Sequence, residues 1–421
     1  MSFFNISLSS QEKKILTLSA LGGMLEFYDF VIYGIFSVYF AHQFFPSHND
    51  LIIIIQSYLV FVLGYIARPI GGIIFSHIGD EYGRKKVLVL TIVLMGISSL
   101  GIGLLPTYAS LGIYAPILLL TLRLLQGLAL GGELPSTFVY ISESIPHKRG
   151  IAFGITMSGV NGGLLFGMVV NYVLNHLLSD TQLNQFGWRL PFIIGGLVCV
   201  ISYRIRQTLH ETAAFNKIHD RPKLPFVFFL KNHLADFFAG TALVGFMAAS
   251  VVVAVVFMPT YLQGILKLSS QRIGDMMMVV MVVNVITIFC IGLVAQKYRP
   301  SLIFLVLMIA NFILVPVGYG LIKLQYYFLG VALLALLEGT AAALTPLLLT
   351  GLFSTQIRLT GVSLCYNVGF TLFGALAPLI ITHGIKKGHG PYIVPIIYLI
   401  IVTLLTTLSL PYFNQSRKIP R

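Results

Sequence analysis

The stretch QTLHETAAFNKIHDRPKLPFVFFLKN, from Gln207 to Asn232, decides how the chain is divided. It is the longest polar interruption of an otherwise apolar sequence, and it holds two prolines and much of the central basic charge. Apolar runs sufficient for six helices precede it, and runs sufficient for six more follow it. We therefore predict two six-helix bundles, at residues 1–208 and 233–421, joined by a loop at 209–232.

Composition places these helices in a lipid bilayer. The 421 residues are 57% hydrophobic and 10% charged, whereas soluble domains contain about 25% charged residues. A helix that spans a membrane needs about 20 apolar residues, so the sequence predicts an all-α membrane protein with 12 transmembrane helices. The expected helices are 15–41, 51–77, 86–105, 112–142, 151–177, 189–208, 234–265, 272–297, 300–322, 326–353, 358–385 and 391–413.

The basic residues predict the orientation of these helices. The net charge is +13, but Lys and Arg punctuate the apolar runs instead of gathering on a soluble face, so nucleic acid is not an expected partner. Most of them fall on the side that carries both termini, and basic loops remain in the cytoplasm. We expect a multi-pass protein of the inner (cytoplasmic) membrane with both termini cytoplasmic and the first helix retained.

Enzymatic and metal-binding functions find no support in the residue pattern. The three cysteines lie far apart, each inside an apolar run, and we interpret them as packing residues. The histidines lack the spacing of metal ligands, and neither a nucleophile with a base nor a phosphate loop is recognisable. The sequence therefore predicts no enzyme, no metal and no cofactor, and it contains no sizeable soluble domain through which a sensor could signal.

Buried charge is the most informative feature of the predicted helices. A charged side chain at the centre of a bilayer costs about 2.5 to 3.5 kcal/mol, so each one needs a reason. Five residues fall in this class: Glu26, Asp29, Arg123, Glu133 and Glu338.

Depth brings three of these residues together. At 1.5 Å per residue, Glu26 lies about 16 Å and Asp29 about 20 Å along the first span, while Arg123 lies about 16 Å along the fourth. Glu26, Asp29 and Tyr33 share one face of their helix because they are spaced i, i+3 and i+7. Two acids beside one arginine leave a negative site in which one acid can carry a proton; the alternative is a structural ion pair that locks two helices together.

The other buried charges can be interpreted either as functional residues or as structural ones. Glu338, about 18 Å into the tenth span, is either a second acid of the transport site or a hydrogen-bonded packing residue. Glu133 lies closer to the cytoplasm, where we expect a gate or a structural pair. Arg68 is expected near the cytoplasmic end of the second span, with its side chain reaching the interface. Glycines of the fifth span should allow close helix packing: Gly154, Gly159, Gly162, Gly163 and Gly167.

The two halves repeat each other weakly. The segment 79–85, GDEYGRK, follows the second span, and 295–300, AQKYRP, follows the eighth, while Arg149 and Arg358 occupy matching loops. A repeat of this kind is typical of a transporter built from two related bundles, with the substrate site at midplane between them.

The segment 76–85, with Asp80, Gly83 and Arg84, resembles the cytoplasmic loop signature of the major facilitator superfamily. The second copy, near Gln296, has lost the aspartate and the Gly-Arg pair, so gating should depend on the first copy. We expect Asp80, Arg84, Glu143 and Arg149 to form a charge cluster that holds the bundles together on the cytoplasmic side. The alternative is that these charges serve only as a topology signal.

A finer resemblance is to the metabolite:proton symporters, which include proline/betaine, shikimate, citrate and 2-oxoglutarate carriers. It rests on six motifs within residues 22–215: Gly22-x-x-x-Glu26-Phe27-Tyr28-Asp29-Phe30, Arg68-Pro69-x-Gly71-Gly72, Arg123-x-x-Gln126-Gly127-x-x-x-Gly131-Gly132-Glu133, Glu143-x-x-Pro146-x-x-Arg149-Gly150, Gly187-Trp188-Arg189-x-Pro191-Phe192 and Glu211-Thr212-x-x-Phe215. The fifth span lacks the Gly-Pro pair of drug exporters, which favours import.

This resemblance implies a secondary transporter that imports a small carboxylate-bearing solute, an organic acid, amino acid or betaine, with a proton. Arg123 would bind the carboxylate because a guanidinium matches it in a bidentate way, Asp29 assisted by Glu26 would exchange the proton, and Tyr33 and Glu338 would shape the site. The partners would be the solute, the proton and membrane lipid, with the protein a monomer. Aromatic residues are also common at packing surfaces, so betaine is not favoured over other solutes. Proton-coupled efflux of cations or drugs is the alternative function.

Overall fold

The computed structural model describes residues 8–47, 50–217 and 225–415. Twelve of its helices are long and apolar enough to cross a membrane, which confirms the predicted all-α membrane protein. The first six spans are α1 (Ser10–Phe44), α2 (Asp50–Tyr82), α3 (Arg84–Leu104), α5 (Tyr114–Ser144), α6 (Arg149–Leu177) and α8 (Arg189–Gln207).

The second six spans include two composite helices. The seventh consists of α11 (Leu234–Val251), a π-helical turn η3 (Val252–Val256), α12 (Met258–Thr260) and η4 (Tyr261–Ile265), and the eleventh consists of α16 (Arg358–Gly369), η5 (Phe370–Ala375) and α17 (Ala377–Lys386). The others are α13 (Ser270–Lys297), α14 (Pro300–Lys323), α15 (Tyr327–Gly351) and α18 (Ile393–Gln415).

Short elements lie in the connections between the spans. They are α4 (Tyr108–Leu111), η1 (Pro146–Lys148), α7 (Asp180–Gln182), η2 (Leu183–Gly187), α9 (Ala213–Asn216) and α10 (Pro225–Asn232). The last two belong to the predicted loop at 209–232, of which residues 218–224 lie outside the described residues.

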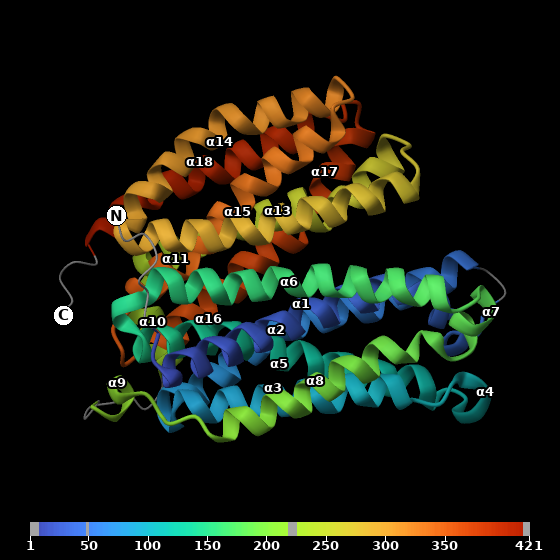
Figure 1. The fold of residues 1–421 in the computed structure, drawn as a ribbon, viewed down its shortest axis with the longest axis horizontal. Coiled ribbons are helices and arrows are strands. Elements are labelled where there is room, and N and C mark those ends of the chain that lie inside the picture. The colour runs from blue at the N-terminus through green and yellow to red at the C-terminus, as the bar shows by residue number, and fades with distance from the viewer. Residues whose placement is uncertain (1–7, 48–49, 218–224, 416–421) are drawn as a thin grey trace.

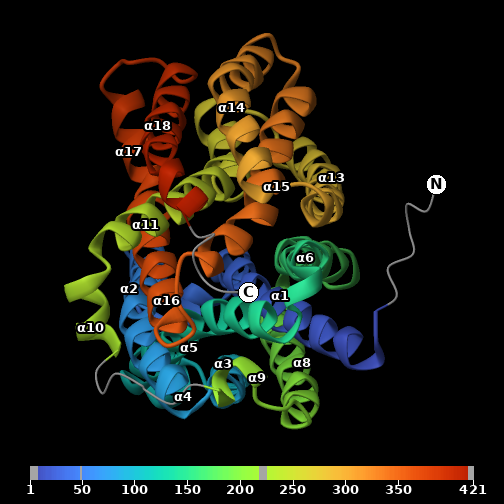
Figure 2. The same cartoon turned by 90° about the vertical axis from the view of Figure 1, so that its left-hand side faces the viewer.

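The spans pack as two groups of six. In the first group α2 packs on α5, α1 on α6, and α3 on α8; in the second, α13 and α14 pack on α15, and α11 packs on α16 and α18. Figure 1 shows the two groups as a blue-to-green layer and a yellow-to-red layer, and Figure 2 shows the same layers from the end that carries α9 and α10. Whether 1–208 and 233–421 are independent units stays a prediction.

The two groups converge at one end of the molecule. We name this end, which carries α9, α10 and the junctions α2–α3, α5–α6, α13–α14 and α15–α16, the basic face, and the opposite end the far face. Helix α6 packs along α13, and α2 packs along α16. In Figure 1 the ribbons of α6 and α13 lie side by side near the basic face and diverge toward the far face.

Glycines set how closely α6 approaches its neighbours. A Cβ atom on Gly163 would lie 2.1 Å from the carbonyl oxygen of Met24, and one on Gly154 would lie 2.9 Å from the Cα of Gly292. The prediction was wrong for Gly162, where a Cβ would meet no atom within 4 Å, because this glycine points away from both partner helices.

This pair of adjacent glycines provides a direct test of the packing. We expect Gly163→Ala to lower the free energy of unfolding by about 1 to 3 kcal/mol, since the methyl group would force α6 away from α1. Gly162→Ala is the matched control, and it should leave stability unchanged or raise it slightly because alanine is the better helix former. Melting temperatures of the purified variants compare the two. Equal effects would show that α6 is not in tight contact with α1.

Candidate functional site

Asp29 lies at the centre of a buried polar group in the first six spans. Its side chain is 0% exposed on α1, and its Oδ2 accepts hydrogen bonds from Ser99 Oγ at 2.6 Å and from Gln126 Nε2 at 2.8 Å. Its Oδ1 has no hydrogen-bond partner among the described residues. That oxygen faces the backbone of α8, since a Cβ on Gly195 would lie 2.9 Å from it. The carboxyl group therefore has one oxygen held in place and one available.

Gln126 connects Asp29 to Arg123. Arg123 Nη1 donates a hydrogen bond to Gln126 Oε1, one helical turn along α5. The guanidinium carbon lies 3.8 Å from the centre of the Tyr33 ring, and the hydroxyl of Tyr33 donates to the carbonyl of Ser57 at 3.3 Å. The structure thus brings Asp29 and Arg123 together, as their depths indicated, and adds Tyr33, which was expected on the same helix face as Asp29.

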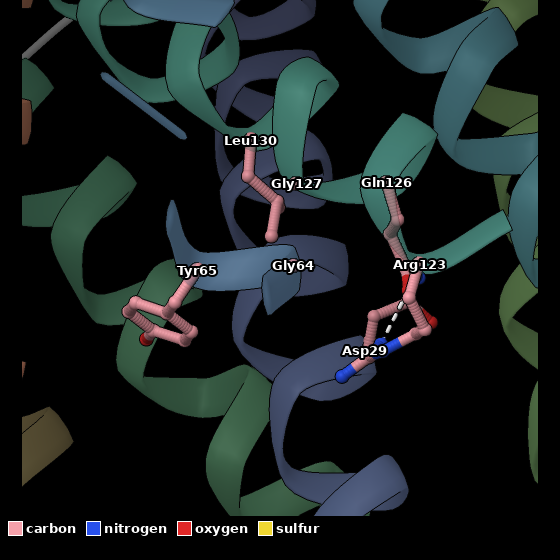
Figure 3. A pocket seen from close by; sticks show the side chains of 7 residues that line it. All are labelled: Asp29, Gly64, Tyr65, Arg123, Gln126, Gly127 and Leu130. Carbon is pink, nitrogen blue, oxygen red and sulfur yellow. Dashed lines mark hydrogen bonds between the residues drawn. The ribbon is translucent and has the colours of Figure 1, made fainter. Parts of the chain in front are cut away.

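A small pocket adjoins this group. Asp29, Arg123 and Gln126 line one side, and Figure 3 shows Tyr65 of α2 apart from them on the other. Gly64 and Gly127 complete the wall, where α2 and α5 touch so closely that a Cβ on Gly127 would lie 1.9 Å from the Gly64 carbonyl oxygen. Neither Ser99 nor Gln126 was predicted as a site residue. The spacing of Gln126, three residues after Arg123, was a usable signal.

Glu26 belongs to a different pair. Its Oε1 accepts a hydrogen bond from Arg68 Nη2 at 2.8 Å, and both side chains are buried. The expectation that Arg68 reaches the interface was wrong, because α2 continues to Tyr82 and buries this arginine, 3% exposed, about 21 Å from the helix end. The net negative group expected around Arg123 therefore becomes two groups, each with its own arginine.

Glu133 and Glu338 each pair within one group of spans. Arg206 of α8 binds both carboxylate oxygens of Glu133, and Thr91 of α3 donates to Oε2. These partners all belong to the first six spans, so the contacts favour the structural-pair alternative for Glu133. Glu338 accepts a hydrogen bond from Asn284 Nδ2 of α13, in the second six spans, and not from the Asp29 group.

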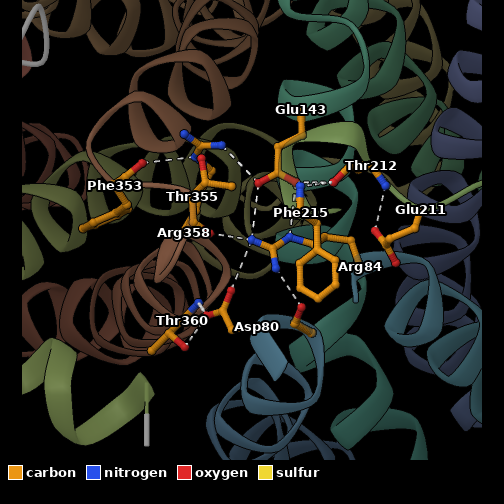
Figure 4. Close-up of polar contacts among 11 residues, drawn as sticks. Asp80, Arg84, Glu143, Glu211, Thr212, Phe215, Phe353, Thr355, Arg358 and Thr360 are labelled. Atoms are coloured by element: carbon orange, nitrogen blue, oxygen red, sulfur yellow. Dashed lines mark hydrogen bonds and ion pairs between the residues drawn. The ribbon is translucent and has the colours of Figure 1, made fainter. Parts of the chain in front are cut away.

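A charge cluster joins the two groups at the basic face. Arg84 lies within 3.4 Å of Asp80 and 3.2 Å of Glu143, and its Nη2 donates to the carbonyl of Thr355 at 2.6 Å, in the connection between α15 and α16. Arg358 Nη1 of α16 binds Glu143 Oε1 at 3.0 Å. Figure 4 shows these side chains converging from both groups, so this cluster closes the seam at the basic face.

Asp80 also caps a helix of the opposite group. Its Oδ2 accepts hydrogen bonds from the backbone N–H of Thr360 at 2.9 Å and from its hydroxyl at 2.7 Å, in the first turn of α16. A carboxylate is favourable there because the N-terminus of a helix carries partial positive charge. Arg149, expected in the cluster, instead donates to the carbonyl of Ser142 at 3.2 Å, and Arg358 from the matching loop occupies the position across the seam.

The motif after the sixth span reinforces this cluster. Thr212 Oγ1 donates to Glu143 Oε2 at 2.7 Å, and the Phe215 ring lies 4.7 Å from the Arg84 guanidinium carbon. Glu211 Oε2 accepts from the backbone N–H of Lys85 at 3.1 Å, beside Gly83, whose φ of 110° suits glycine. No role was predicted for this motif, because its partners lie more than 60 residues away in the sequence.

The degraded second copy of the loop signature still caps a helix of the opposite group. Gln296 Oε1 accepts a hydrogen bond from the backbone N–H of Gly150 at 3.0 Å, in the first turn of α6, and its Nε2 donates to the carbonyl of His147 at 2.8 Å. An amide therefore caps α6 where a carboxylate, Asp80, caps α16. Without the negative charge this contact is expected to be weaker than the one at Asp80.

Comparison with known proteins identifies the family. The model of the Major Facilitator Superfamily matches residues 19–378. The chain is 32% identical over 425 residues to the inner membrane metabolite transport protein YhjE of Escherichia coli (strain K12), covering 97% of this chain and 95% of that protein. It is 27% identical over 430 residues to the ectoine/proline transporter ProP of Corynebacterium glutamicum, covering 96% and 84%.

The chain belongs to the major facilitator superfamily. The solved structure of the proton:xylose symporter XylE bound to 6-bromo-6-deoxy-D-glucose has the same fold, with a TM-score of 0.78 at 16% identity, over 98% of this chain and 96% of that one. Membership makes this facilitator a multi-pass membrane transporter and not an enzyme.

Neutralising Asp80 tests whether the basic-face cluster acts as a gate. In this facilitator Asp80→Asn keeps an acceptor oxygen but removes a helix-capping charge worth about 0.3 to 2 kcal/mol. We expect slower transport with unchanged solute affinity. The matched control is Glu81→Gln, since Glu81 pairs with His77 on the exposed side of the same helix end. Equal transport rates in Asp80→Asn and wild-type protein, at equal membrane levels, would reject the gate.

Proposed function

We propose that this transporter imports a small carboxylate-bearing solute together with a proton, by alternating access. One observation carries the proposal: Asp29 is a fully buried acid with one oxygen fixed by Ser99 and Gln126 and the other without a hydrogen-bond partner among the described residues. Such a group can take up and release a proton without losing its position. Intramembrane acids are typical of proton pathways in transporters.

The orientation of the chain follows from its charge. Because basic loops remain in the cytoplasm, we assign the basic face to the cytoplasm, and with it both termini. The closed cluster of Asp80, Arg84, Glu143 and Arg358 then seals the cytoplasmic side, and solute and proton would enter from the far face. The inner membrane location agrees with the name of YhjE. The working unit in this proposal is the monomer, in contact with membrane lipid.

The hydrogen bonds around Asp29 suggest how a proton is sensed. An ionised Asp29 accepts from the Gln126 amide, whose oxygen in turn accepts from Arg123. A proton on Asp29 removes the negative charge that favours the hydrogen bond from Gln126. The Gln126 side chain can then rotate, which breaks its hydrogen bond with Arg123. Arg123 can then bind a solute carboxylate. Without a solute, it would keep its contact with the Tyr33 ring. The proton would thus change the shape of the site before the spans move.

The energy of the proton is sufficient for accumulation. One proton moving through 100 mV supplies about 2.3 kcal/mol. At one-to-one coupling to a neutral solute this corresponds to roughly fiftyfold accumulation. The names of two relatives, a metabolite transport protein and an ectoine/proline transporter, favour uptake of small metabolites over efflux of drugs.

Uptake into proteoliposomes tests the proposal. With a preset inside-alkaline pH gradient, we expect accumulation of a carboxylate-bearing solute, chosen from a panel of organic acids, amino acids and betaines. Asp29→Asn should abolish this accumulation while downhill exchange of the same solute continues, because only the proton step is lost. Asp236→Asn, the same change at a carboxylate that pairs with His233 at 3.0 Å, is the matched control and should behave like wild type.

Three other outcomes of the proteoliposome experiment would contradict parts of this proposal. Loss of preloaded solute or of a cationic dye under the same gradient would support proton-coupled efflux instead. Full accumulation by Asp29→Asn would remove the proton role from Asp29. Absence of any gradient-driven movement across the whole panel would contradict proton-coupled transport.

A further inference from the structure

Glu338 is a buried acid of the second group that is held by an amide and not by an arginine. It lies on α15, about 20 Å from the basic-face end of that helix, and it is 1% exposed. Its Oε2 accepts a hydrogen bond from Nδ2 of Asn284 on α13, and Nδ2 also donates to the carbonyl of Ala335 at 2.9 Å. The other buried acids of the described chain are bonded to an arginine, directly or, for Asp29, through Gln126. Glu338 therefore differs from them in having no counter-charge.

The helices around Glu338 supply no cation to it. α15 packs on α11, α13, α14, α16, η3, and on α5 and α6 of the first group, and Glu338 is the only charged residue of α15. The charged residues of the packed helices lie within two turns of a helix end or, on α5, in the groups described above: Asp236, Arg272, Asp275, Lys297, Lys323, Arg358, Arg149, His176, Arg123, Glu133 and Glu143. In the described part of the chain, none of them forms an ion pair with Glu338. Tyrosines and cysteines of the same helices are largely uncharged at neutral pH.

The hydrogen bonds that Glu338 and Asn284 leave unmade favour a protonated acid. A buried carboxylate without a counter-charge is unstable, and such a group binds a proton instead. Glu338 Oε1 and Asn284 Oδ1 are both buried, and neither has a hydrogen-bond partner among the described residues. A proton on Oε1 would turn that oxygen into a donor, and Oδ1 of the same amide could accept from it. A metal ion needs more oxygen ligands than these two, so the pair suits a proton.

The pair lies beside the seam between the two groups of spans. The carbonyl of Val285, the residue after Asn284, accepts a hydrogen bond from Ser158 Oγ of α6 at 3.1 Å. At the same level α13 and α15 are in close contact, since a Cβ on Gly339 would lie 3.2 Å from both Nδ2 and the backbone oxygen of Asn284. Opening the basic face would move α6 away from α13 and α15. Water could then reach this level, and a hydrated carboxylate is stable when it is ionised.

We propose that Glu338 and Asn284 form a second proton site, which binds a proton when the basic face closes and releases it when the basic face opens. The proposal rests on the proposed function, because it requires alternating access, and it adds a regulatory site to that function. On closing, Oε1 of Glu338 takes a proton from water on the basic-face side, and the O–H bond forms. On opening, that bond breaks and the proton returns to water on the same side.

This proton is not carried across the membrane. While the basic face is closed, Glu338 is 1% exposed, so it is sealed from the far face as well. Asp29 remains the acid that couples import to the proton. The second site instead makes closure of the basic face depend on the pH at that face: the proton stabilises the closed state at acid pH, and this stabilisation is lost as the pH rises. With the basic face in the cytoplasm, an acid cytoplasm would slow import.

Spin-label distances across the basic face test the proposal in the full-length protein in lipid nanodiscs. All variants carry Asp29→Asn, which removes the other proton site, Cys290→Ser, which removes the exposed cysteine, and labelled cysteines at Glu81 and Gln356. We expect the ratio of closed to open molecules to fall by up to about tenfold for each unit of pH increase, because closure binds one proton. Adding Glu338→Gln should remove most of this response and keep the basic face closed. Adding Asp275→Asn, at an exposed acid of α13, is the matched control and should leave the response unchanged.

Infrared spectra of the same variants detect the proton directly. The carbonyl stretch of a protonated carboxyl group gives a band separate from those of ionised carboxylates. At a pH where the basic face is closed, Glu338→Gln should remove one such band, and in the variant that keeps Glu338 this band should weaken as the distances shift to the open state. Equal melting temperatures show that the variants are folded. The same distances in sodium-free potassium buffer should be unchanged.

The outcomes separate this inference from the proposed function. An equal pH response with and without Glu338, no band lost in Glu338→Gln, or a response that requires sodium would overturn the second proton site. Glu338→Gln with Asp29 intact should still accumulate whichever of L-proline, glycine betaine or 2-oxoglutarate the wild type accumulates, although more slowly. Loss of that accumulation would show that Glu338 carries the coupled proton, which also overturns the inference. If the wild type accumulates none of them, the proposed import fails, while the distances and spectra still decide whether Glu338 binds a proton.

Discussion

The closed seam at the basic face depends on two arginines that each have one acceptor in the opposite group of spans. Arg84 of the first group reaches the Thr355 carbonyl of the second, and Arg358 of the second reaches Glu143 of the first. Opening the seam would remove one acceptor from each arginine, although each keeps acceptors in its own group. A hydrogen bond to a charged group contributes about 1.5 to 3 kcal/mol, so both contacts favour the closed seam. Asp80, which caps α16, and Gln296, which caps α6, add further hydrogen bonds between the two groups. Under the proposed alternating access, the Asp29 group would be open to one side of the membrane while this cluster is closed and to the other side while it is open.

Hydropathy predicted the spans because lipid imposes a simple requirement on the backbone, that every peptide group be satisfied within its own helix. It failed at the end of α2, which continues for five residues beyond the predicted boundary to Tyr82. That last stretch is polar, with Asp80 buried by contacts from the second group. Hydropathy ends a helix where the lipid ends, whereas α2 extends into the seam at the basic face. Arg68 therefore lies in the interior and not at the interface.

The sequence predicted those contacts of the candidate site that follow from how deep each residue lies along its helix. Asp29 and Arg123 lie together because rise per residue fixes their level, and Tyr33 joins them because it shares a helix face with Asp29. Glu26 was assigned to the wrong arginine because level does not specify which neighbouring helix a side chain faces. The same limit explains Arg149 and Arg358, since the matching loops were recognised but the side chain that crosses the seam depends on how the groups pack. Ser99 and Gln126 carry no charge, so the cost argument did not select them.

We propose that the basic-face cluster sets the balance between closure at the basic face and closure at the far face. Spin labels on a pair of introduced cysteines measure each end in a separate variant in which the exposed Cys290 is replaced by serine. The pair at Glu81 and Gln356 spans the basic face, and the pair at Gln185 and Lys387 spans the far face. We predict that Glu143→Gln, which removes the shared partner of Arg84 and Arg358, lengthens the first distance and shortens the second. Distances that stay constant, or that change in the same direction at both faces, would contradict the account.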